Sequence, residues 1–302
     1  MNMLLALSLI SFDPGVGTAG FDFLRVTPTA REAAMAGAVT GDAQSPMAFW
    51  YSPALVLGSE LPRAHVGYVN YVAGIHLGSV AYSRPLAANK GIGIGIVYLN
   101  AGTMKRTDPL GNELGMFGVS YTDVNLSAAL KLSELVLVGA GFQGLYGSID
   151  TFFGIGVAAN LGARARIPLE GFEGLYAGLA CRNIGYQAKP FQSGRDKMPL
   201  EFAVGLAYLP NSSINLTADV LKPVDNRFVF RAGIEGWVAD ILVLRAGYTT
   251  LGADLKSGGG TDILAGLTTG LGFRYQKYQL DYAFIPMVEL GMAHRISFSI
   301  EL

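Results

Sequence analysis

Few residue groupings in the sequence have the types and spacing that cofactor chemistry needs. Gly139, Gly141 and Gly144 form a G-x-G-x-x-G pattern directly after the apolar run 135–138. Such a pattern binds a dinucleotide when a helix follows it, because the helix N-terminus holds the pyrophosphate. Residues 145–163 are instead broken by repeated glycines and rich in β-favouring residues. We therefore predict that the pattern lies in a strand and that no cofactor is bound.

The sequence also contains no residue pattern that indicates a metal site or a catalytic nucleophile. His65, His76 and His294 are far apart in the sequence, with no spacing suited to a metal ion. Cys181 is the single cysteine, and no nucleophile elbow or paired-histidine helix motif is present. These observations predict a protein that is not an enzyme and holds no metal.

A third grouping consists of charged residues that recur on one side of alternating segments. Such charges are open to two interpretations: a ladder that lines a substrate path, or ion pairs that hold an internal segment. We favour ion pairs, because buried charges are tolerated when they are paired. The residues are Asp219, Glu235, Arg245, Asp281 and Arg295.

The composition limits the elements that can position these residues. Of 302 residues, 51% are hydrophobic and 15% charged, yet no run of about 18 apolar residues occurs. The 40 glycines disfavour a mainly helical fold, since each costs roughly 1 kcal/mol in a helix relative to alanine. A net charge of −1 argues against nucleic-acid binding. A transmembrane β-barrel, apolar at every second residue, fits this composition.

Alternation of polarity is clearest in the last segment, residues 289–302. Leu290, Ile296 and Phe298 fall on one face, whereas Glu289 and Arg295 fall on the other. A strand with one apolar and one polar face explains this period of two. The period alone does not distinguish a soluble sandwich, whose apolar faces meet inside, from a membrane barrel, whose apolar face meets lipid.

Two further observations favour the barrel. Tyrosines often stand at segment ends, as interfacial girdles require. When the connections between strands are numbered along the chain, the odd ones lie outside in an even-stranded barrel and the even ones are short inner turns. The three longest polar connections are all odd: 102–115, 188–197 and 251–261. The even connection 164–173 is long and is an exception. We predict an all-β fold, a transmembrane antiparallel barrel over 61–302 with fourteen strands near 62–73, 75–86, 90–101, 116–132, 135–147, 150–163, 174–187, 198–209, 213–222, 227–238, 240–250, 262–274, 277–286 and 289–302.

The residues before the barrel do not alternate. Residues 3–12 (MLLALSLISF) suit the core of a signal peptide, which predicts a leader over 1–19, although a buried N-terminal segment is the alternative. Residues 28–38 (PTAREAAMAGA) predict a short helix. Because a fourteen-stranded lumen is too wide for its own side chains to fill, we predict that 20–60 form a plug, or hatch. A periplasmic arm is the alternative.

Glycines on the polar face support an occupied lumen. Large side chains at these positions would collide with a plug, so small ones are expected there. The glycines concerned are Gly205, Gly233, Gly247, Gly266, Gly270, Gly272 and Gly291.

Several stretches together resemble the PorV/PorQ family of outer-membrane proteins, which is itself similar to the FadL fatty-acid channels. They are 17–25 (GTAGFDFLR), 34–38 (AMAGA), 50–54 (WYSPA), 182–185 (RNIG), 244–248 (LRAGY), 281–284 (DYAF) and 294–297 (HRIS). The resemblance implies a fourteen-stranded outer-membrane barrel with an N-terminal hatch. Its hatch motif maps onto Arg31, Trp50, Ser52, Pro53 and Ala54; Ser52 replaces the family's usual Asn, so a gating role of that Asn does not carry over.

From this resemblance we predict a component of type IX-like secretion in the outer membrane of a Gram-negative bacterium. Its outer loops would bind a translocon or the C-terminal domains of cargo, and its wall would contact membrane lipid. The alternative is a FadL-like channel for hydrophobic small molecules, with the ligand in the lumen. A soluble β-rich enzyme is a third, less favoured possibility.

Overall fold

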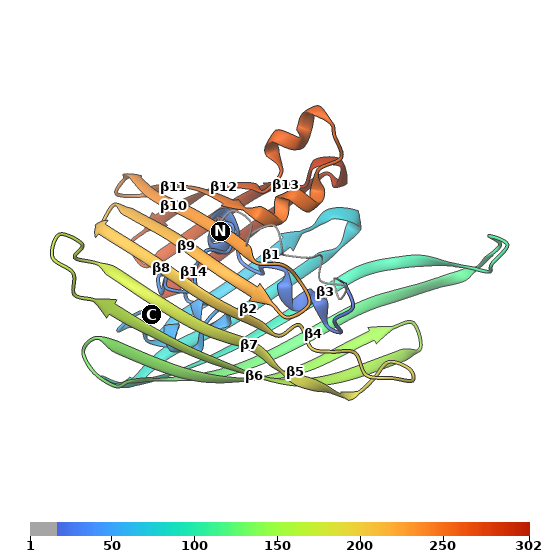
Figure 1. Ribbon diagram of the computed structural model, residues 1–302, viewed down its shortest axis with the longest axis horizontal. Coiled ribbons are helices and arrows are strands. Elements are labelled where there is room, and N and C mark those ends of the chain that lie inside the picture. The colour runs from blue at the N-terminus through green and yellow to red at the C-terminus, as the bar shows by residue number, and fades with distance from the viewer. Residues whose placement is uncertain (1–16) are drawn as a thin grey trace, which may run out of the picture.

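Fourteen antiparallel strands close into a barrel, with β1 paired to β14 (Figure 1). The computed structural model describes residues 17–302. The predicted fold class is therefore confirmed. The strands are β1 (Arg63–Asn70), β2 (His76–Ala87), β3 (Lys90–Thr107), β4 (Glu113–Lys131), β5 (Val136–Ile149), β6 (Phe152–Ile167), β7 (Leu175–Lys189), β8 (Glu201–Asn211), β9 (Ile214–Pro223), β10 (Val229–Ala239), β11 (Leu242–Thr249), β12 (Leu267–Tyr275), β13 (Tyr278–Pro286) and β14 (Met292–Glu301).

Side chains alternate across the wall as a membrane barrel requires. On β4, Val124 and Leu126 are exposed on the outside, whereas Asp123 and Asn125 are buried inside. This arrangement is the reverse of a soluble sandwich and matches a lipid-facing apolar surface. Among the described residues, no helix has the length and apolar character needed to cross a membrane.

Most of the short connections lie at the end of the barrel that holds the start of β1 and the end of β14; the two-residue connection between β5 and β6, at the other end, is an exception. Short turns mark the periplasmic end of such barrels, and the longer loops mark the outer end. The long polar connections at 188–197 and 251–261 lie at the outer end; they span 190–200 and 250–266, the latter containing the 3-10 helices η5 (Thr250–Leu255) and η6 (Gly260–Leu264). The connection 164–173 is at the periplasmic end, but β6 continues to Ile167 and shortens it.

The prediction of a loop at 102–115 was wrong. Residues 103–107 pair with 113–118, so β3 and β4 continue as a two-stranded ribbon that projects beyond their neighbours (Figure 1). Pairing of β3 with β2 ends at Asn100, and the register between β3 and β4 shifts there. Gly102, with a φ of 71°, lets the ribbon leave the wall at this point. Only residues 108–112 form the turn.

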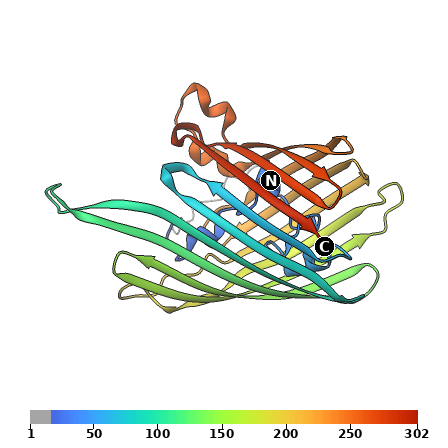
Figure 2. The same cartoon turned by 180° about the vertical axis from the view of Figure 1, so that it is seen from behind.

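Residues 20–60, which we call the hatch, lie inside the barrel and precede β1 (Figure 2). The hatch contains η1 (Asp22–Arg25), α2 (Ala30–Ala34), η2 (Ala48–Trp50) and η3 (Pro53–Leu57). The helix expected over 28–38 is only one turn long, because Ala36 and Gly37 adopt positive φ and end it. Helix α2 packs on β11–β14, whereas η3 packs on β2–β6. The predicted leader at 1–19 falls mostly outside the described residues.

Glycines allow the hatch to approach the wall closely, although not at every position expected. A Cβ on Gly205, Gly233, Gly247 or Gly270 would meet hatch atoms, and one on Gly272 would meet wall side chains. Gly266 and Gly291 were assigned wrongly, because both lie in outer connections with positive φ, away from the hatch. They are glycines because those turns need a left-handed backbone.

The assignment of the fold as a membrane barrel can be tested by gel electrophoresis. The closed hydrogen-bonded wall resists detergent, so the unheated protein should migrate differently from the boiled protein in a denaturing gel. The protein should also require detergent for extraction from membranes. A soluble protein with a single mobility would contradict the lipid-facing assignment of the wall.

Candidate functional site

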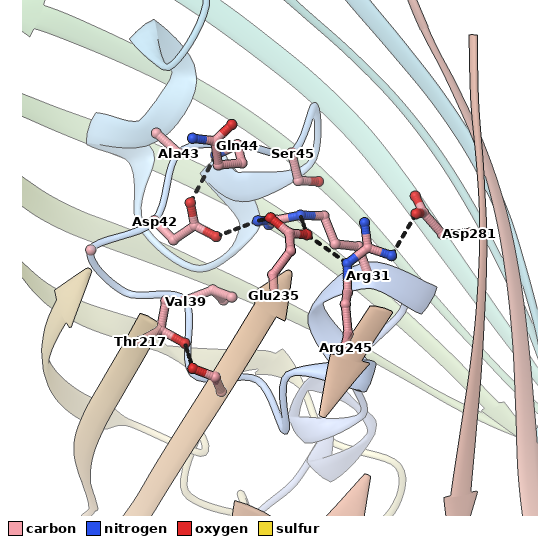
Figure 3. A network of polar contacts seen from close by, with 12 residues as sticks. Arg31, Val39, Asp42, Ala43, Gln44, Ser45, Thr217, Glu235, Arg245 and Asp281 are labelled. Carbon is pink, nitrogen blue, oxygen red and sulfur yellow. Dashed lines mark hydrogen bonds and ion pairs between the residues drawn. The ribbon is translucent and has the colours of Figure 1, made fainter. Parts of the chain in front are cut away.

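A buried ion network joins the hatch to the wall (Figure 3). Arg31 on α2 lies 2.8 Å from Asp42 of the hatch and donates two 2.9 Å hydrogen bonds to Glu235 on β10. Glu235 also accepts a 2.6 Å hydrogen bond from Arg245 on β11. Arg245 in turn donates through Nη1 to Asp281 on β13, at 2.7 Å. Because the charges alternate in sign, each buried ion is compensated by its neighbours.

The network continues toward the periplasmic end of the wall. Gln279 donates to both carboxylate oxygens of Asp281, at 3.0 and 2.8 Å. The guanidinium of Arg274, on β12, donates two hydrogen bonds to the Gln279 Oε1, at 3.0 and 2.7 Å. A continuous chain of polar contacts therefore runs from the interior of the hatch to the periplasmic turn between β12 and β13.

Two more of the predicted wall charges bond to the hatch separately. Asp219 on β9 accepts hydrogen bonds from the backbone nitrogens of Val39 and Thr40, both at 3.0 Å, and from the Thr40 hydroxyl at 2.7 Å. Arg295 on β14 donates from Nε to the Thr27 carbonyl oxygen at 3.1 Å. All five predicted charges thus face inward and are buried, and three of them belong to one network.

The residues of the hatch motif fall into two places. Arg31 contacts the β10 side, whereas Trp50, Ser52, Pro53 and Ala54 lie near η3, which packs on β2–β6. Pro53 begins η3, a position where its missing N–H is no loss. Gly139 and Gly162 on the wall leave room for this segment, since a Cβ on Gly139 would overlap the backbone of Pro53 and Ala54 and a Cβ on Gly162 would overlap the Ser52 hydroxyl oxygen.

A cavity of about 90 Å³ lies between the hatch and the wall formed by β7–β10, toward the outer end. The hatch contributes Arg25, Trp50 and Tyr51, and the wall contributes Arg182, Glu201 and Arg231, among other residues. None of these three wall residues was predicted from the sequence to be a site residue. Arg182 lies at an irregularity in the middle of β7, whereas Glu201 and Arg231 lie at or near the outer ends of β8 and β10.

A β-bulge on β7 shapes this cavity. Cys181 pairs with Leu161 and Ile184 pairs with Ala159, so the two residues between them, Arg182 and Asn183, oppose Asn160 alone. Asn183 has a φ of 61°, donates its backbone N–H to Asn160 Oδ1 at 2.8 Å, and donates its side-chain amide to the Pro199 carbonyl at 3.0 Å. Bulges of this kind redirect side chains next to functional sites. Here the bulge directs Arg182 toward the cavity.

The guanidinium of Arg182 is held in place on two sides. It forms an ion pair with Glu201 at the start of β8. Its Cζ lies 5.9 Å from the centre of the Tyr51 ring. These contacts link the bulge to the hatch across the cavity.

An outer loop covers the mouth of the barrel next to this cavity. Residues 190–200, which we call the lid loop, place Phe191 against Phe21 of the hatch, with ring centres 5.8 Å apart, and against Tyr121 of β4, at 6.3 Å. The backbone of Gly20 donates to the Lys197 carbonyl at 2.9 Å. The beginning of the hatch and the lid loop therefore hold each other.

The remaining sequence motifs take up structural positions. Gly139, Gly141 and Gly144 lie within β5, which leads into β6 and not into a helix. His65 is buried between Ser79 and Ser299 inside the wall. Across residues 17–302, no three His, Cys, Asp or Glu side chains come together in a way that could hold a metal ion.

By sequence, the chain matches no protein-family model and none of the curated proteins. By structure it is similar to the CymD monoaromatic hydrocarbon channel, with a TM-score of 0.66, 11% identity, and coverage of 94% of this chain and 99% of that one. The Pseudomonas putida toluene transporter TodX gives a TM-score of 0.62 at 12% identity, with coverage of 90% and 96%. A Pseudomonas aeruginosa FadL homologue gives 0.58 at 13%, with coverage of 91% and 99%. The chain therefore has the fold of FadL-type outer-membrane channels.

Proposed function

We propose that the protein is an outer-membrane channel for hydrophobic small molecules, with the hatch as its gate. One observation supports this most directly: the lipid-facing barrel encloses a hatch that leaves a cavity next to the wall. Similar structures carry the names of hydrocarbon channels, which is consistent with the proposal. Among the sequence-based interpretations, the FadL-like channel agrees better with these neighbours than the secretion component does.

In this proposal the hatch residues have two roles. Arg31 anchors the hatch to the wall through the ion network, and Trp50, next to Ser52, Pro53 and Ala54, presents an aromatic surface to the cavity. Polar bonds suit a gate, because each can be exchanged for a bond to water as the hatch shifts. An apolar contact of the same area would resist wetting.

A reversible cross-link tests the gate. We expect that joining the hatch to the wall through Thr40→Cys and Asp219→Cys, in a Cys181→Ser background, stops toluene flux into proteoliposomes. The Thr40 and Asp219 side chains are in hydrogen-bond contact, so a short thiol-reactive linker spans them. Cleaving the linker should restore the flux of the uncross-linked protein.

The two single-cysteine variants cannot form the cross-link and serve as matched controls, so the linker should leave the flux through each of them unchanged. Unchanged toluene flux through the cross-linked protein would contradict gating by the hatch. An absence of toluene flux in every variant, with the barrel folded, would contradict the proposed channel itself.

A second candidate function, a PorV/PorQ-like role in secretion, is favoured by the projecting β3–β4 ribbon. Leu110 at its tip is 87% exposed, and Leu114 and Met116 are also exposed. Apolar side chains on an unpaired ribbon suit a protein partner. Co-purification of a secretion translocon or of cargo C-terminal domains, lost on trimming 102–115, would support this role; retention of the partner after trimming would contradict it.

A further inference from the structure

We propose that a groove on the lipid-facing surface of β2–β5 binds one anionic phospholipid of the periplasmic leaflet. An acyl chain lies in the groove, and the phosphate lies at Arg84 and Lys90. The site is on the other side of the wall from the hatch. The proposal depends on the membrane-barrel fold and goes beyond the proposed channel function.

The groove is a depression between large apolar side chains of the wall. Its floor is formed by Ala128 on β4 and Ala140 on β5, which are cross-strand partners and both face outward. Ile92 on β3 stands directly opposite Ala128 and flanks the floor on one side. Leu126 and Phe142 flank the floor toward the outer end of the barrel. Two small side chains therefore face lipid where their neighbours project.

The size and lining of the groove suit a hydrocarbon chain. Its volume is about 570 Å³, within the range of roughly 300–1,000 Å³ that is typical of small-molecule sites, and its lining is almost wholly apolar. An acyl chain already in the bilayer gains no hydrophobic energy by moving onto a protein, so dispersion contacts must hold it there. A depression supplies more of these contacts than a flat wall. The headgroup must supply the rest of the specificity.

Two cations stand at the periplasmic end of the groove. Arg84 on β2 faces outward as the cross-strand partner of Ile92, and Lys90 stands two residues before Ile92 on the same face of β3. Both side chains are exposed, and neither forms an ion pair with a carboxylate of the part of the chain that the structure describes. Glu134, in the nearby turn between β4 and β5, pairs with Lys131 instead. The two cations are therefore available to an external anion.

These cations lie at the level where phospholipid headgroups are expected. Strand β2 ends and β3 begins at the short periplasmic turn 88–89, so Arg84 and Lys90 are among the last residues of the wall. Arginine and lysine near the end of a spanning segment extend their side chains to the membrane interface. Cations there attract anionic lipid, and each raises the affinity about fivefold. A phosphate bound between the two places its acyl chain beside Ile92, at the entrance to the groove.

Native mass spectrometry of the delipidated protein tests the headgroup site, with two phospholipids that have the same oleoyl chains. We expect one molecule of phosphatidylglycerol to bind more tightly than phosphatidylcholine, whose headgroup has no net charge. The double variant Arg84→Gln with Lys90→Gln should bind phosphatidylglycerol about thirtyfold more weakly, close to its binding of phosphatidylcholine. Lys277→Gln removes a charge from the turn between β12 and β13, at the same end of the barrel, and should bind as the parent does.

A second pair of variants tests the groove. Ala128→Phe fills the floor with an apolar side chain, which a lipid-facing position tolerates, and should weaken the binding of both phospholipids about tenfold. Ala218→Phe makes the same change at an exposed, outward-facing position on β9 and should leave binding unchanged. Heat-dependent gel mobility of each variant shows that the barrel has folded.

Three results would overturn the proposal. The first is equal binding of the two phospholipids by the parent protein. The second is phosphatidylglycerol binding that is unaffected by removal of the two cations or by filling of the groove. The third is a lipid-free dimer that dissociates in Ala128→Phe, which would assign the groove to a second copy of the chain. None of these results concerns toluene flux, so the proposed channel function is tested separately.

Discussion

Replacing Glu235 by glutamine is expected to release the hatch from the wall while the barrel stays closed. The Glu235 carboxylate lies between Arg31 and Arg245, and all three side chains are buried. Removing the shared anion leaves two guanidiniums facing each other, at a cost of about 3–5 kcal/mol. The wall keeps its backbone hydrogen bonds, so this cost falls on the hatch–wall contact. Single-channel conductance should rise, and the hatch should become sensitive to added protease.

An exposed ion pair gives the matched control. Lys105 and Glu113 on the projecting ribbon are both largely exposed, so Glu113→Gln should change conductance very little. A double variant, Arg31→Met with Glu235→Met, should recover part of the loss, since it removes both charges of one pair. Conductance of Glu235→Gln equal to that of the parent would show that the network does not hold the hatch.

The second large effect is expected from a single methyl group at Gly178 on β7. A Cβ at this position would overlap the Thr40 carbonyl and lie 2.7 Å from the Gly41 nitrogen. Both are hatch backbone atoms and neither can rotate away. We expect Gly178→Ala to displace the hatch locally and to lower its stability by about 1–3 kcal/mol. Proteolysis of the hatch, followed by gel mobility of the intact barrel, measures the two effects separately.

Gly144→Ala is the control for this substitution. Gly144 lies on β5 with an ordinary backbone conformation, and nothing stands within 4 Å of the position its Cβ would occupy. Both substitutions replace a glycine in a wall strand by alanine, so any loss of hatch protection in Gly144→Ala would indicate a general effect of replacing wall glycines. Equal protection in Gly178→Ala and Gly144→Ala would contradict close contact between β7 and the hatch.

Alternation predicts most of the wall, because each residue in a strand meets either lipid or the interior. The alternation of polarity stops predicting the direction of side chains where a strand no longer separates lipid from the barrel interior. Beyond Asn100 the β3–β4 ribbon has water on both sides, so its residues show no period of two and were interpreted as a loop. At the β7 bulge, Arg182 and Asn183 interrupt the alternation, and the cavity that they shape could not be predicted.

The candidate site could be predicted only in part for a similar reason. The inward direction of Glu235, Arg245 and Asp281 follows from strand polarity. The partners of these charges cannot be predicted in the same way. Arg31 stands 204 residues before Glu235, and only the closed barrel brings the two side chains together. The inward direction of Arg231 follows from strand polarity as well, but its hydrogen bond to the Gly37 carbonyl depends on the hatch, which is 194 residues away in the sequence.

The position of the hatch ahead of β1 has a consequence for folding. Ala30 donates its backbone N–H to Ser297 on the last strand, and Arg63 at the start of the first strand donates to the Ala43 carbonyl. The β1–β14 seam that completes the cylinder joins the two ends of the barrel sequence, which is the most expensive loop to close. A hatch that is already inside when that seam forms would serve as the template around which the last strands assemble.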